Sequence, residues 1–132
     1  MDTLLSIHSI LRWVIVVVAA LAVIKFAVGW ASNATFKGVD RGLASGFSGL
    51  MDLQVLLGLV YFIWNGMGGA GFPLYRILHM IVMVLAAVAA HIPSRLKALT
   101  DKLRFLYSML IILGVLVLIY AGVALLPGGW SR

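Results

Sequence analysis

The sequence predicts an all-α membrane protein: a four-helix transmembrane bundle with both termini outside the cytoplasm. Of its 132 residues, 64% are hydrophobic and 11% are charged, whereas soluble domains are about 45 to 50% apolar and about 25% charged. The apolar residues fall into four long runs. Because a span takes about 20 residues, four spans fill most of the chain and leave no room for a soluble domain. Residues 1–132 are therefore expected to form a single transmembrane domain.

The first two helices are expected over residues 3–30 and 40–65, around the apolar runs 10–28 and 47–64. Near the start of the second helix, small residues recur at a spacing of four, and this spacing permits close contact between helices. We therefore expect this helix to pack closely and to be a possible site of homo- or hetero-oligomer formation. The small residues are Gly42, Ser45, Gly46 and Gly49.

The third and fourth helices are expected over residues 73–92 and 103–126. A glycine-rich turn at 66–71 precedes the third helix, and Pro73 suits its first position because proline lacks the amide hydrogen that is unsatisfied there. The third helix should stop before Pro93, and the fourth should end at Pro127.

The distribution of basic residues predicts the orientation in the membrane. The chain has ten Lys and Arg against four Asp and Glu, a net charge of +6. Four crossings place both termini and the glycine-rich turn on one side, and the loops around 31–42 and 93–104 on the other. Basic loops stay in the cytoplasm and face anionic lipid, so the excess indicates a lipid bilayer rather than nucleic acid as partner. Three basic residues (Arg12, Arg76 and Arg132) lie on the side of the termini, and seven (Lys25, Lys37, Arg41, Arg95, Lys97, Lys102 and Arg104) lie on the loop side.

Ionisable residues at membrane depth are costly and tend to mark function. His8 lies at the start of the first helix and His79 lies about one turn inside the third, so both are expected near the outer face. Arg12 follows His8 by four residues and Arg76 precedes His79 by three, which places each arginine on the helical face of its histidine. The pattern predicts two histidine and arginine pairs at one depth.

Such a pair of imidazoles is what a haem b requires. We expect one haem b between the first and third helices, with His8 and His79 as axial metal ligands and with Arg12 and Arg76 pairing with its propionates. Small residues below the histidines are expected to form a slot, with Met83 lining it. The alternative is an ordinary helix end, in which histidine and arginine extend toward the head groups. The slot residues are Ile15, Ala19, Ala22, Met83, Ala86, Ala87 and Ala90.

His91 cannot share an iron with His79, because the twelve residues between them span about 18 Å of helix. We expect His91 to be an interface residue, which limits the protein to one haem. Asp52 is expected to pair with Lys25 or Arg104, or to accept a proton from a bound quinone.

Gln54, in the inner half of the second helix, shares a helical face with Gly58 and Tyr61, and no single site is expected to combine it with Asp52. The chain has no cysteine, which excludes disulfides, thiolate metal sites, iron–sulfur clusters and c-type haem attachment. No nucleophile triad, P-loop or dinucleotide fingerprint is found, so no catalytic residue is assigned.

The opening of the chain, residues 7–13, reads Ile-His-Ser-Ile-Leu-Arg-Trp. It resembles the LHSxLRW opening of a family of small four-span bacterial membrane proteins described as cytochrome b-like. The likeness continues in Asp40-Arg41, in residues 54–59 and in His79. The family has His-x-Gln and a glutamate where this chain has Asp52-Leu53-Gln54 and Leu78. The resemblance implies a haem-b-type bundle in a bacterial cytoplasmic membrane.

Together these features predict a membrane haem-b electron-transfer protein or redox subunit that serves a larger membrane redox complex or the quinone pool. Two alternatives stay open. One is a haem-free accessory or structural subunit of a larger membrane complex. The other is a quinol or porphyrinogen oxidoreductase.

Overall fold

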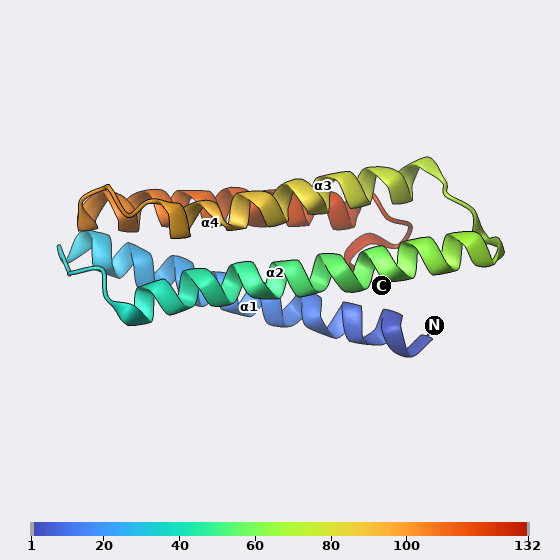
Figure 1. The fold of residues 1–132 in the computed structure, drawn as a ribbon, viewed down its shortest axis with the longest axis horizontal. Helices are drawn as coiled ribbons and strands as arrows, with labels where there is room; N and C mark the ends of the chain where they lie inside the picture. Colours follow the sequence, from blue (N-terminus) through green and yellow to red (C-terminus); the bar gives the residue numbers. More distant parts are fainter. Residues whose placement is uncertain (1, 132) are drawn as a thin grey trace.

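The computed structural model describes residues 2–131 and is built of helices throughout (Figure 1). The long helices are α1 (Asp2–Ala31), α2 (Gly38–Asn65), α3 (Leu74–Ala90) and α4 (Asp101–Ala124), with short helical turns η1 (Gly66–Ala70), η2 (Ile92–Arg95) and η3 (Gly129–Ser131). Within the described residues, four helices are long and apolar enough to cross a membrane. The all-α, four-span prediction is therefore confirmed. Arg132, counted above for orientation, lies outside the described residues, and the orientation stays a prediction.

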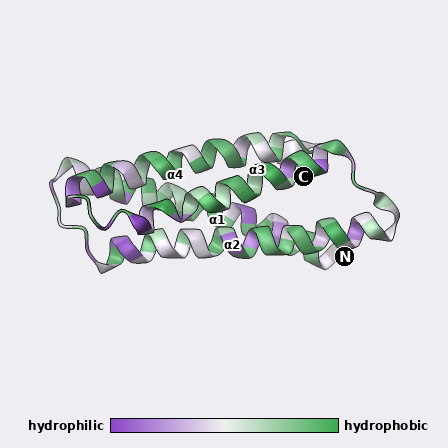
Figure 2. Ribbon diagram, turned by 45° about the horizontal axis from the view of Figure 1, so that its top comes forward, coloured by the Kyte–Doolittle hydropathy of each residue, from purple (hydrophilic) through white to green (hydrophobic). Residues whose placement is uncertain are grey.

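The helices alternate in direction around the bundle. α1 packs against α2 and α4, and α3 packs against the same two helices, so α1 and α3 face each other across a diagonal. We call the end with residues 66–73 and the two chain ends the turn end, and the end with residues 32–37 and 91–100 the loop end (Figure 1). Figure 2 shows hydrophobic residues along the length of the helices.

The observed helix boundaries differ from the predicted ones where a proline ends a helix or a side chain caps its first turn. α3 ends at Ala90, and residues 92–95 form a tighter 3₁₀ turn around Pro93. α4 begins at Asp101, two residues earlier than predicted, because the Thr100 hydroxyl accepts a hydrogen bond from the amide of Leu103 at 3.5 Å. The glycine-rich segment continues α2 as a wide turn, and Gly69 adopts φ 120°, a conformation that favours glycine.

Large aromatic side chains fill the loop end. The rings of Phe26, Phe36 and Phe105 have centroids 5.0 to 6.1 Å apart, and all three side chains are buried. Gly29 permits this packing, since a Cβ atom there would lie 2.5 Å from the Phe105 ring. Asp40 is only 1% exposed and pairs with Lys25 at 2.8 Å. The centre of the bundle is therefore closely packed at this end.

Two predicted packing features are placed differently by the structure. Ala19, Ala22, Ala86 and Ala90 are fully buried, but they fill the centre of the bundle rather than line a slot, because α1 and α3 do not pack on each other directly. The three glycines of this α2 pattern are not needed for close packing within the chain: a Cβ atom at Gly42, Gly46 or Gly49 would meet nothing within 4 Å among the described residues. Their role in oligomer formation stays a prediction.

Candidate functional site

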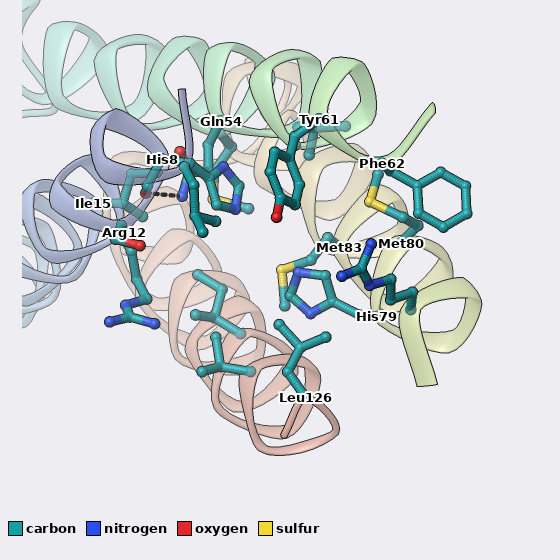
Figure 3. A pocket seen from close by; sticks show the side chains of 18 residues that line it. His8, Arg12, Ile15, Gln54, Tyr61, Phe62, His79, Met80, Met83 and Leu126 are labelled. Carbon is teal, nitrogen blue, oxygen red and sulfur yellow. Dashed lines mark hydrogen bonds between the residues drawn. The ribbon is translucent and has the colours of Figure 1, made fainter. Parts of the chain in front are cut away.

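A cavity of about 100 Å³ lies at the turn end, bounded by all four helices (Figure 3). Its walls are mainly apolar, with a few polar groups from α1, α2 and α3, which is the usual character of a small-molecule site. The lining residues are Leu5, His8, Ser9, Arg12 and Ile15 from α1; Met51, Gln54, Val55, Gly58, Tyr61 and Phe62 from α2; Arg76, His79, Met80 and Met83 from α3; and Ile119, Val123 and Leu126 from α4 and its end.

His79 presents a defined nitrogen. Its Nδ1 lies 2.7 Å from the carbonyl oxygen of Gly122 on α4. A carbonyl can only accept a hydrogen bond, so Nδ1 carries the hydrogen and Nε2 carries the lone pair. Histidines that bind metal commonly donate their other ring nitrogen in this way, because the bond orients the ring and raises its basicity.

His8 enters the same cavity from α1 (Figure 3). Its Nδ1 is buried and has no hydrogen-bond partner in the part of the chain that the structure describes, a costly arrangement for a polar atom. Gly58 provides the space for the ring, since a Cβ atom there would lie 2.9 Å from His8 Cε1. The Gln54 side chain donates from Nε2 to the carbonyl oxygen of His8 at 2.7 Å, and so ties α2 to α1 at this point.

The two arginines line the cavity from different helices, Arg12 from α1 and Arg76 from α3. Arg76 donates to Asn65 Oδ1 at 2.5 Å. The Arg12 guanidinium lies 5.3 Å from the ring centroids of both Trp13 and Trp130. Both cations are thus oriented by neighbours, which suits arginine for holding a planar anionic group.

The structure brings together the five residues that the sequence predicted for the site. His8, Arg12, Arg76, His79 and Met83 all line this one cavity. Whether they bind a cofactor or a metal stays a prediction.

Five polar or sulfur-bearing wall residues are not predicted for the site from the sequence: Ser9, Met51, Gln54, Tyr61 and Met80. Gln54 was placed in the inner half of its helix, yet it reaches the cavity. The available signal was the face that it shares with Gly58 and Tyr61, because this face leads directly to the histidines.

His91 and Asp52 form a separate pair. His91 Nε2 lies 2.9 Å from both carboxylate oxygens of Asp52, and the side chains are 47% and 52% exposed. The prediction that Asp52 pairs with Lys25 or Arg104 is therefore wrong. Lys25 is engaged by Asp40 instead, and the Arg104 guanidinium stacks over the Phe36 ring at 4.0 Å. Neither member of the His91 pair lines the cavity.

Among residues 2–131, no group of three or more His, Cys, Asp or Glu side chains could hold a metal ion. The nitrogen donors of the cavity are two imidazoles, the number that an axial haem pair requires. This donor set fits a haem b. The volume is less favourable, because a cavity of about 150 Å³ holds a single benzene ring, and a macrocycle would have to extend beyond the present cavity.

Comparison with protein-family models, curated proteins and solved structures finds no match to this chain. The resemblance to the cytochrome b-like family therefore stays a prediction, and function has to be inferred from the cavity itself.

Proposed function

We propose that the protein is a membrane electron-transfer protein or redox subunit that binds one haem b in the turn-end cavity, with His8 and His79 as axial ligands. The observation that supports this most is the pair of imidazoles. They come from diagonal helices and enter one apolar cavity, and one of them is fixed through Nδ1 by the Gly122 carbonyl. The buried Nδ1 of His8, which lacks a hydrogen-bond partner among the described residues, also supports a ligand in this cavity. A bound group that rotated the imidazole ring would bring this nitrogen to a partner and remove the cost of leaving it unsatisfied.

Each neighbouring side chain then has a defined part. Gln54 holds the α1 backbone at His8, and the Gly122 carbonyl orients His79. Arg76, oriented by Asn65, places positive charge beside the cavity, where it would pair with a propionate and favour the reduced state. Ile119 and Val123 give the cavity an apolar wall on the α4 side. When bound, a haem with two imidazole ligands supplies reversible one-electron transfer.

The test is a reduced-minus-oxidised absorption spectrum of the protein purified from membranes in mild detergent. We expect haem bands in the parent protein. His8→Ala and His79→Ala should each lower haem retention by at least about tenfold, since even indirect partners of a metal ligand are worth about that much. His91→Ala is the matched control and should retain the haem, because its ring contacts Asp52 outside the cavity.

Loss of the haem in His91→Ala with retention in His8→Ala would show that the ligand pair is wrong. A parent protein without haem bands, after growth with added haem precursor, would reject the haem proposal.

A quinone or quinol headgroup is the second candidate, and the cavity volume favours it. About 100 Å³ suits a single ring better than a macrocycle. Tyr61 and Gln54 supply the hydroxyl and amide groups that donate hydrogen bonds to quinone oxygens, and the Nε2 lone pair of His79 would accept a hydrogen bond from a quinol hydroxyl.

In this case the protein lacks haem bands, and a short-chain quinone analogue quenches its tryptophan fluorescence in a saturable manner. Tyr61→Phe should weaken this binding because it removes a hydroxyl donor from the cavity wall, and His91→Ala should not. If neither haem nor quinone binds, the accessory-subunit interpretation replaces both.

A further inference from the structure

A second cavity, of about 180 Å³, lies at the loop end. It is formed where the start of α2, the segment after α3 and the start of α4 come together. Three basic residues line it, one from each of these segments: Arg41, Lys97 and Arg104. Ser45 and Ser94 add two hydroxyl groups. The cavity is separate from the site of the proposed redox function, which lies at the turn end.

The three positive charges have no carboxylate beside them in this cavity, because no acidic residue is among its described lining residues. Asp40, the nearest in sequence to Arg41, is buried and turned to other partners: it accepts hydrogen bonds from Lys25 Nζ at 2.8 Å and from the Lys37 amide at 2.9 Å. Asp52 is engaged by His91. Asp101, three residues before Arg104, does not line the cavity, and no ion pair among the described residues joins any of the three cations to a carboxylate. The cavity therefore concentrates positive charge.

The guanidinium of Arg104 includes a buried donor that lacks a hydrogen-bond acceptor among the described residues. Its Nε atom is buried and has no hydrogen-bond partner within residues 2–131. Its guanidinium lies 4.0 Å from the Phe36 ring centroid, which holds the planar group in one orientation. A buried donor without an acceptor is unfavourable, and an oxygen-rich anion is the ligand that would satisfy it. Phosphate and carboxylate groups match the paired donors of an arginine.

The position of the cavity identifies the source of the anion. Arg41 and Arg104 each lie within the first turn of a membrane-spanning helix, and Lys97 lies in the connecting segment between two spans. Lipid head groups occupy this depth, and basic pockets between transmembrane helices bind anionic head groups there. We propose that this cavity binds the phosphate of an anionic phospholipid, with Arg104 and the two other cations as its direct ligands.

The experiment compares two lipids that share acyl chains and a phosphate but differ in net charge, phosphatidylglycerol and phosphatidylcholine. The full chain in neutral detergent is mixed with each lipid, and the retained lipid is counted by native mass spectrometry. We expect the protein to retain phosphatidylglycerol and to release phosphatidylcholine, because the choline cation is repelled by three positive side chains.

The variants separate a formed cavity from general surface charge. Arg104→Gln should lower retention of phosphatidylglycerol by about tenfold, the loss expected for one buried charged hydrogen bond. The double variant Arg41→Gln and Lys97→Gln changes two exposed side chains. It should lower retention by a similar factor, which tests the proposal even if Arg104→Gln fails to fold. Arg95→Gln is the matched control, because it removes an exposed charge at the same end from a residue that does not line the cavity.

Equal losses in the control and in the cavity variants would overturn the proposal, since bulk charge would then explain the binding. Inorganic phosphate forms the other arm. If millimolar phosphate displaces the lipid and stabilises the lipid-free protein to heating, and if both effects vanish in the cavity variants, the ligand is a soluble phosphate and the lipid assignment is overturned. Retention of lipid in the presence of phosphate supports the proposal.

Discussion

The two ends of the bundle differ in what occupies the centre between the helices. At the loop end, three phenylalanine rings and a half-buried ion pair fill this centre, and the cavity there lies beside them among basic side chains. At the turn end, the same four helices enclose a cavity with two histidines in its wall. Glycine is used at both ends, but with different results. Gly29 lets a phenylalanine ring close the core, whereas Gly58 lets an imidazole ring stand beside a cavity.

The contrast indicates where the bundle gains its stability and where it can bind a ligand. Close packing of large side chains stabilises one fixed arrangement of the helices. Residues that line a cavity lack some of these contacts and contribute less to stability. Their side chains can therefore serve ligand binding instead. The following predictions test this division between the two ends.

Topology gives an all-or-none test of which end faces the cytoplasm. The seven-to-three distribution of basic residues predicts that the loop end faces the cytoplasm. A reporter enzyme that is active only outside the cytoplasm should therefore be active when it is fused after Arg132, and a reporter that is active only inside the cytoplasm should not. A second fusion, in the loop at Lys97, should give the opposite result. An active cytoplasmic reporter at the C-terminus would reverse the assignment of the two ends.

Truncation of the loop-end core should have the largest effect on stability. Phe105→Ala removes a fully buried ring that contacts Phe26 and Phe36, and it should lower the free energy of unfolding by about 3 to 5 kcal/mol. Denaturant-induced unfolding in detergent micelles measures the change. Tyr61→Phe in the cavity wall is the control for the turn end and should cost less than about 1 kcal/mol. Similar losses would remove the contrast between the ends.

The buried ion pair should be the next most sensitive feature. Asp40→Asn leaves Lys25 without its carboxylate partner and weakens the bond to the Lys37 amide. We expect a loss of about 2 to 3 kcal/mol, below the range for a fully buried pair because Lys25 is 43% exposed. Asp52→Asn is the matched control and should change stability by at most about 1 kcal/mol, since the pair with His91 is half exposed on both sides.

A glycine substitution should separate binding from stability at the turn end. Gly58→Ala would place a methyl group 2.9 Å from His8 Cε1 and displace the imidazole ring. We expect a loss of ligand retention with a change in unfolding free energy of less than about 1 kcal/mol, because alanine favours the helix by a similar amount. Gly46→Ala on the same helix meets open space and should leave both quantities nearly unchanged or slightly raise stability. A ligand that binds Gly58→Ala normally would show that the position of His8 does not matter.

Much of the fold could be predicted from the apolar runs and from the residues that begin or end helices, because both depend only on the local sequence. The runs at 10–28 and 47–64 predicted α1 and α2 to within two residues at each end. α3 was predicted too long, because the 3₁₀ turn at Ile92–Arg95 depends on how the chain continues into the next loop.

The site was predictable only in part. His8 and His79 stand out because charged or titratable residues are rare in such segments, and the spacing of four and three residues identified their arginines. The contributions from α2 and α4 could not be predicted, since they depend on which helices become neighbours. The same reason explains the wrong partner predicted for Asp52, because His91 lies 39 residues away in the sequence. It also explains why the predicted alanine slot is absent: α1 and α3 lie diagonally across the bundle and do not pack on each other directly.

The hydrogen bond from His79 has a second consequence, for the end of α4. The last four carbonyl groups of a helix lack amide partners within it, and Gly122 belongs to this final turn of α4. The amides that follow satisfy its neighbours: Leu125 donates to Ala121, and Leu126 donates to Val123. The carbonyl of Gly122 receives its hydrogen from His79 instead. The imidazole therefore serves as a C-terminal cap for a helix to which it does not belong. Any rotation of this ring would uncap α4 at a buried residue and leave the Gly122 carbonyl without this donor.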